Sequence, residues 1–186
     1  RPLIGVLTDH VHTPRAIAKR MMEYHLDKDY TMRVAEHLGN PKKEKIYNIY
    51  SIEEISEMSF SCPNCVLLMK APNSTQQRPT LGIPDTKFVL LNDRAKMITK
   101  APIRVMDLSL LELHNSRTFW DIGACTGSVS IEARRQYAHL NIQAFEVREE
   151  CKDIIRANAR LHSAPGIDLH IGNFLNLPIA EDAIVD

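Results

Sequence analysis

The strongest constraint on the fold is a segment in which an apolar strand, a loop of small residues and a helix follow one another directly. Residues 118–122 predict the strand, residues 128–136 predict the helix, and the loop between them holds Gly123 and Gly127. Glycines there allow positive φ angles and let a ligand approach backbone N–H groups at a helix N-terminus. Such a turn joins a parallel strand to its crossover helix, so the segment favours an α/β fold.

The residues on either side repeat the alternation of strand and helix. Strands are expected at 142–147 and 169–171, with a helix at 149–162 between them. Thr99 is the expected N-cap of an earlier helix at 100–113. The inner face of that helix is expected to carry Ile103, Met106, Leu110 and Leu113. This order predicts a parallel sheet with helices on both faces.

The N-terminal residues predict a second α/β unit. Strands are expected at 3–7, 31–38, 45–50 and 66–69, and helices at 14–26 and from residue 52. Thr13 is the expected cap of the first helix, and Ser51 with Glu54 forms a capping box for the second. Residues 71–81 are polar and contain two prolines, which indicates a linker at 73–81. The expected domains are therefore 1–72 and 82–186.

Composition excludes several classes of protein and partner. The chain is 44% hydrophobic and 25% charged, which is typical of a soluble globular protein. It has 23 basic and 23 acidic residues, a balance that argues against a nucleic-acid partner. We see no membrane-spanning apolar run and no signal peptide, and we interpret the four cysteines as reduced thiols. We expect a cytoplasmic homo-oligomer with no metal site; Cys62 and Cys65, and His10 and His12, lack further ligands at metal-binding spacing.

Polar and aromatic side chains follow the three strands of the second unit. The first strand leads into the glycine loop, the second ends at Glu146, and the third ends at Asn173 and Phe174. Because the carboxyl ends of parallel strands share one edge of the sheet, these groups are expected to form one site. A carboxylate there accepts hydrogen bonds from a ribose diol, an amide reads an adenine edge, and a phenyl ring stacks on adenine.

The spacing of the glycines discriminates between nucleotide cofactors. Gly123 and Gly127 are separated by three residues, whereas a dinucleotide fingerprint reads G-x-G-x-x-G. Asp121, two residues before the first glycine, suits the amino group of S-adenosylmethionine. The pattern favours S-adenosylmethionine over a dinucleotide, and over a loop that only turns the chain.

Three further motifs are Gly82-Ile83-Pro84-Asp85, Met97-Ile98-Thr99-Lys100 and Gly127-Ser128-Val129-Ser130-Ile131-Glu132. Through these motifs the sequence resembles the decarboxylating precorrin methyltransferases of cobalamin (vitamin B12) biosynthesis. The N-terminal unit resembles the closing half of a tetrapyrrole methylase domain, through residues 4–14 and 36–41. The resemblance thus implies the fused precorrin-6Y C5,C15-methyltransferase family, with an incomplete tetrapyrrole-methylase half followed by an incomplete Rossmann-like class I methyltransferase domain.

The resemblance implies a reaction and a set of binding residues. The precorrin-type tetrapyrrole would be methylated at C5 and C15, and its C12 acetate would lose carbon dioxide. The residues implied for S-adenosylmethionine are Thr99, Asp121, Gly123, Ala124, Cys125, Thr126, Gly127, Glu146, Asn173 and Phe174. The cations expected to meet the substrate carboxylates are Arg94, Lys96, Lys100 and Arg104, with a solvated face as the alternative. No catalytic residue is assigned.

Two positions depart from the family pattern. Cys125 stands where glycine is more frequent and is expected to crowd the cofactor, and Asn173 replaces a common aspartate. The chain begins without Met and ends in a strand-like segment, so we expect a piece of a longer protein. Its N-terminal unit would lack C5 activity, because the half with its own glycine-rich motif is missing. A methyltransferase for RNA or another substrate, and a catalytically inactive fragment, remain the alternatives.

Overall fold

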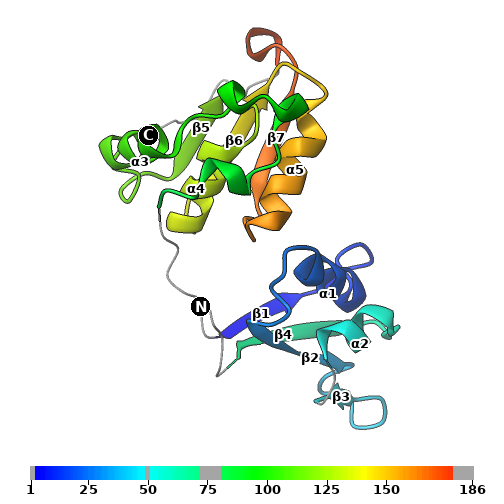
Figure 1. Cartoon of the computed structure of the whole chain (residues 1–186). Helices are drawn as coiled ribbons and strands as arrows, with labels where there is room; N and C mark the ends of the chain where they lie inside the picture. Colours follow the sequence, from blue (N-terminus) through cyan, green and yellow to red (C-terminus); the bar gives the residue numbers. More distant parts are fainter. Residues whose placement is uncertain (1–2, 49–50, 72–80, 178–186) are drawn as a thin grey trace. The chain divides into compact units, whose positions relative to one another are not determined.

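The chain divides into two compact units, Arg1–Gln77 and Arg78–Asp186, shown in Figure 1. The computed structural model describes residues 3–48, 51–71 and 81–177. The expected linker at 73–81 lies outside the described residues except for Leu81.

The first unit is an antiparallel sheet with two helices. Its elements are β1 (Leu3–Leu7), α1 (Pro14–Glu23), β2 (Tyr30–Glu36), β3 (Lys45–Tyr47), α2 (Ile52–Glu57) and β4 (Asn64–Lys70). The strands pair in the order β1-β4-β2-β3, every neighbouring pair antiparallel. The core between sheet and helices is apolar and includes Ala18, Met32, Val34, Ile55 and Val66.

Local capping signals in this unit are confirmed. The Thr13 side chain accepts a hydrogen bond from the Ala16 N–H, and Pro14 opens α1. The Ser51 hydroxyl accepts from the Glu54 N–H while the Glu54 carboxylate accepts from the Ser51 N–H, a complete capping box. Helix α1 ends earlier than expected, at Glu23.

The second unit contains a parallel sheet in the order β5-β6-β7. Its elements are α3 (Ala101–Leu110), β5 (Thr118–Ile122), α4 (Ser128–Gln136), β6 (Asn141–Glu146), α5 (Cys151–Leu161) and β7 (Ile167–Ile171). Short 3-10 turns lie at Asp85–Lys87, Leu91–Asp93, Ala95–Met97 and Phe174–Asn176. The expected mixed α/β fold is therefore present, and β5 and α4 have the expected bounds.

Helices were expected on both faces of this sheet, whereas those described form one layer. Helix α4 packs against both α3 and α5 and against the sheet (Figure 1). The reason is topological, since successive right-handed crossovers in the order β5-β6-β7 put both connecting helices on one face. Successive side chains of a strand point to opposite faces of the sheet, and those that point away from the helices contribute to an aromatic cluster. In this cluster the Phe145 ring lies 4.8 Å from His170, 5.0 Å from Phe174 and 5.4 Å from Trp120.

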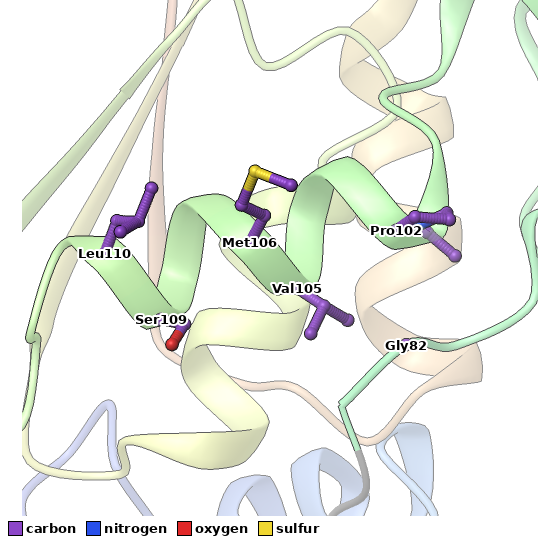
Figure 2. Close-up of a pocket in the computed structure, with 7 residues that line it drawn as sticks. Gly82, Pro102, Val105, Met106, Ser109 and Leu110 are labelled. Carbon is purple, nitrogen blue, oxygen red and sulfur yellow. The ribbon is translucent and has the colours of Figure 1, made fainter.

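Helix α3 is turned differently from the prediction. Ile103, Met106 and Leu110 are 47%, 56% and 75% exposed, while Arg104 and Leu108 are buried. Figure 2 shows this outer side, where Met106 and Leu110 help to line a surface hollow of about 640 Å³. Of the expected inner residues, Leu113 is buried as predicted, whereas Ile103, Met106 and Leu110 were wrong, because the ion pairs of Arg104 turn that residue toward α4.

Candidate cofactor-binding site

A pocket of about 410 Å³ lies where the three parallel strands end. It is lined by Ile122, Gly123, Phe145, Glu146, Val147, Arg148, Gly172, Asn173 and Phe174. The structure therefore brings together four residues proposed from the sequence, namely Gly123, Glu146, Asn173 and Phe174. The sequence reasoning missed Val147 and Arg148, although their positions directly after the strand-end acid were a usable signal.

The glycine loop is built on β6. The N–H groups of Gly123 and Ala124 donate to the Phe145 carbonyl at 2.8 and 3.0 Å, and the Cys125 N–H donates to Glu146 at 2.8 Å. These three N–H groups hold the loop against the neighbouring strand. Gly127 has a φ of 72°, and a Cβ there would meet the Ile155 side chain at 3.0 Å, so this position requires glycine.

Cys125 was expected to crowd the cofactor, but its side chain does not line the pocket. Its backbone is in the left-handed region, with φ 48°, and its side chain packs in a buried cluster with Cys151 and Ile155. Burial raises the pKa of the Cys151 thiol to about 11. Thr126 is also buried, with a hydroxyl oxygen that has no partner in the described structure. The loop thus presents backbone to the pocket and side chains to the core.

Glu146 is the electrostatic centre of the pocket. Its carboxylate is 1% exposed and accepts four hydrogen bonds, which come from the Cys125 N–H at 2.8 Å and from Arg148 through N–H, Nε and Nη2 at 3.0, 2.9 and 3.0 Å. Burial opposes its ionisation, but the bonds from Arg148 and Cys125 outweigh burial and lower the pKa of Glu146. The same pairing raises the pKa of Arg148. Glu146 is therefore an ionised acceptor at neutral pH.

Asp121 lies near the end of β5 and contacts Ser130 in the first turn of α4. Its Oδ2 accepts from the Ser130 N–H at 3.1 Å and from the Ser130 hydroxyl at 2.6 Å. Burial raises the pKa of Asp121 and repulsion from Glu146 adds to the shift, while the Ser130 bonds oppose it. In the structure Asp121 links β5 to α4; a contact with a cofactor stays a prediction.

At the far end of the pocket, Asn173 is exposed and Phe174 is half-buried. The Asn173 Oδ1 accepts from the Leu175 N–H at 3.1 Å, which leaves the amide nitrogen as the group available for reading a base. Phe174 meets Phe145 edge to face. These two residues thus border the pocket opposite the glycine loop.

Thr99 was expected to cap α3, and this was wrong. The N-cap is Lys100 without a side-chain bond, and the first-turn N–H of Ala101 donates to the Asp85 carboxylate at 3.0 Å. Thr99 is exposed, and its carbonyl accepts from Arg104. A carboxylate sixteen residues upstream therefore does the capping, which local sequence patterns do not reveal.

The four expected substrate cations do not form one set. The Arg104 side chain is 0% exposed and forms ion pairs with Glu132 at 2.7 Å and with Asp85 at 2.8 Å. Its guanidinium also bonds to the Thr99 and Ile83 carbonyls. We call these residues the Arg104 network; they accept from four of the five guanidinium N–H groups, and full burial keeps Arg104 from a substrate.

The other three cations lie at the surface. Arg94 and Lys96 are exposed, and Lys100 forms a half-exposed ion pair with Asp85 at 3.4 Å. Of the four expected cations, these three therefore present charge to solvent.

Asn158 on α5 is a positioning residue that sequence reasoning missed. It is fully buried, accepts from the Val89 N–H at 2.7 Å, and donates to the Val89 and Thr126 carbonyls at 3.0 and 2.9 Å. It thus joins α5, the segment before α3 and the glycine loop. No periodic pattern marks a buried polar residue inside a helix, so only the tertiary contacts reveal its role.

The described residues include no helix long and apolar enough to cross a membrane. They also include no group of three or more side chains that could hold a metal ion. The four cysteines are free thiols, and His12 pairs with Asp9 at 2.9 Å.

Comparison with known proteins adds independent information. Residues 91–177 match the family model of the precorrin methyltransferase domain. The cobalt-precorrin-6B C(15)-methyltransferase (decarboxylating) of Salmonella typhimurium is 38% identical over 72 residues, which are 39% of this chain and 38% of that protein. The precorrin-6Y C(5,15)-methyltransferase [decarboxylating] of Mycobacterium tuberculosis is 26% identical over 162 residues, 83% of this chain and 37% of that protein.

A solved structure of precorrin-6y C5,15-methyltransferase from Geobacter metallireducens is 35% identical, with a TM-score of 0.46 over 51% of this chain and 49% of that one. The chain spans less than two fifths of the length of the two curated relatives. Every residue that lines the pocket lies within 91–177. The segment that builds the pocket therefore matches the precorrin methyltransferase domain model along its described length.

Proposed function

We propose that residues 82–186 form an S-adenosylmethionine-dependent methyltransferase domain that acts on a precorrin-type tetrapyrrole. The observation that carries the proposal is the ionised, buried Glu146 at the carboxyl end of β6, beside the glycine loop. The family match of residues 91–177 supports it independently. The names of the curated relatives supply the substrate class and the decarboxylation of the reaction.

The residues present fit this cofactor. Glu146 would accept hydrogen bonds from the ribose hydroxyls, and Phe174 with the Asn173 amide nitrogen would bind the adenine. The loop from Gly123 to Gly127, with Asp121 below it, would hold the methionine end. S-adenosylmethionine supplies a methyl group on a sulfonium sulfur, open to in-line displacement. The chain contributes positioning and electric field, and no covalent partner is required.

The substrate side of the site would use exposed cations. A precorrin carries several carboxylates, which Arg and Lys side chains pair with well. Arg94, Lys96 and Lys100 remain in the proposed set, and Arg104 is removed from it because it is fully buried. The reaction that the resemblance implies is methylation of the tetrapyrrole at C15 with loss of carbon dioxide from its C12 acetate.

The N-terminal unit is proposed to be the C-terminal half of a C5 tetrapyrrole methylase domain. The similarity to the Mycobacterium tuberculosis protein extends over 83% of the chain, so it includes residues of both units. We therefore retain the fused organisation, 1–72 and 82–186, and with it the expectation of a cytoplasmic homo-oligomer. Expression of the protein with its native flanking sequence would test whether C5 and C15 are both methylated.

The first test is calorimetric titration with S-adenosylhomocysteine, the product form of the cofactor. The wild-type chain is expected to bind in the range of about 1–100 μM, and Glu146→Ala to bind at least about tenfold more weakly. Glu149→Ala is the matched control, because Glu149 is 70% exposed and pairs only with Lys152 among the described contacts. A folded wild-type chain that does not bind, or equal losses in both variants, would refute the proposal.

A further inference from the structure

Glu146, the proposed ribose acceptor, is already saturated with donors from the protein. Two of its four hydrogen bonds come from backbone N–H groups, those of Cys125 and Arg148. The other two come from the Arg148 guanidinium, whose Nε donates to one carboxylate oxygen and whose Nη2 donates to the other. A carboxylate offers about four lone-pair sites, so no site remains for a ligand.

The two kinds of bond differ in how easily they can be broken. The Cys125 N–H belongs to the loop that is held on β6 by the Phe145 carbonyl, so that bond is part of the framework. The Arg148 side chain is 32% exposed and lines the pocket, so it has solvent beside it. A ligand diol that needs two acceptor sites can therefore obtain them only where the guanidinium is now bound.

We propose that Arg148 competes with the ribose for Glu146, and that cofactor binding requires the diol to displace its guanidinium from both carboxylate oxygens. This inference rests on the proposed function. Arg148 is thus a positioning residue that keeps the empty pocket's carboxylate oriented. It also sets the affinity of the pocket, because two bonds from a charged guanidinium must be exchanged for two from uncharged hydroxyls to the same carboxylate.

The same arrangement makes the pocket selective for an intact ribose. A ligand with both hydroxyls replaces both guanidinium bonds. A ligand without them cannot replace either bond, and it leaves the Glu146–Arg148 pair closed. Removing Arg148 should therefore change the binding of the first ligand and leave that of the second unchanged.

The experiment titrates S-adenosylhomocysteine and its 2′,3′-dideoxy analogue into wild-type protein, Arg148→Ala, Arg148→Lys and Arg156→Ala. Arg148→Ala should bind S-adenosylhomocysteine about fivefold more tightly than wild type, with the dideoxy analogue unchanged. The affinity of Arg148→Lys for S-adenosylhomocysteine should fall between those of wild type and Arg148→Ala, because lysine has one ammonium in place of the bidentate guanidinium. Arg156 is an exposed arginine of α5, so its variant controls for the loss of one positive charge.

The outcomes separate this inference from the proposed function. If wild type binds and Arg148→Ala binds equally well or more weakly, Arg148 is no competitor and the inference fails alone. Equal shifts for both ligands would show a structural effect of Arg148 and would also overturn it. If wild type and Arg148→Ala are both folded by thermal melting and neither binds, the proposed function fails and the inference with it.

Discussion

Two buried glutamates in the second unit each meet an arginine, and the surroundings give the two pairs different roles. In the Arg104–Glu132 pair the side chains are 0% and 1% exposed, and in the Arg148–Glu146 pair they are 32% and 1% exposed. The first pair is enclosed by α3, α4 and residues 82–85, and four of its five guanidinium N–H groups have protein acceptors. The second opens on a pocket. The same kind of ion pair thus stabilises the fold in one place and can be replaced by bonds to a ligand in the other.

The largest expected effect comes from breaking the enclosed pair. Arg104→Ala should reduce the free energy of unfolding of the second unit by about 3–5 kcal/mol, because Glu132 is left as a buried, uncompensated charge. Chemical denaturation followed by Trp120 fluorescence measures this. Arg148→Ala should cost far less, and equal losses in the two variants would contradict the distinction between the pairs.

The next effect tests whether uncharged buried contacts also hold the glycine loop. Asn158→Ala should cost about 2–3 kcal/mol, since it leaves the Val89 N–H and the Thr126 carbonyl without their partner. Asn141→Ala, at an exposed position, serves as the control and should change stability by less than about 0.5 kcal/mol. A loss of that small size in Asn158→Ala would show that the loop does not depend on this contact.

Glu146→Gln should reduce stability by about 1–2 kcal/mol at pH 7, because the ion pair with Arg148 is lost and the remaining hydrogen bonds are made to an uncharged acceptor. The folded-state pKa of Glu146 lies below its ordinary value of 4.5, so its contribution is present above that value and is lost as pH falls through the folded pKa. Denaturation between pH 7 and pH 3 should therefore show a smaller acid destabilisation in Glu146→Gln than in wild type. Parallel pH profiles would argue against the ionised pair.

The smallest effect is expected at Asp121, whose pKa is raised. A raised acid pKa disfavours folding as pH rises through it, so Asp121→Asn should gain stability at pH 7, by less than about 1 kcal/mol, and none at low pH. If Asp121 also binds the amino group of the cofactor, the same variant should bind S-adenosylhomocysteine more weakly. A stability loss at pH 7 would show that the Ser130 bonds require the charge.

Much of the fold was readable from the sequence because it depends on short-range patterns. The strand at Thr118–Ile122 and the helix at Ser128–Gln136 were predicted with their bounds, since a glycine loop separates two clear periodicities. The capping box at Ser51 was also predicted, because both of its bonds join residues three apart. Glu146 was placed at the strand end for the same reason.

The parts that failed depend on residues far apart in the chain. The amphipathic pattern of α3 indicated Met106 and Leu110 as inner residues, but the charges of Asp85 and Glu132 turn Arg104 inward instead. Thr99 looked like a cap by local rules, yet Asp85 satisfies that N–H from another segment.

The sequence by itself determined the alternation of strands and helices, the glycine loop, the strand-end acid and the resemblance to a cofactor-binding family. Only the tertiary structure decided which arginine is buried and which lies open beside the pocket. Periodicity and capping act over one or two helical turns, so residues close together in the sequence determine them. The burial of a charge depends on whether distant carboxylates converge on it, and that is settled only when the sheet, the helices and the preceding segment pack together.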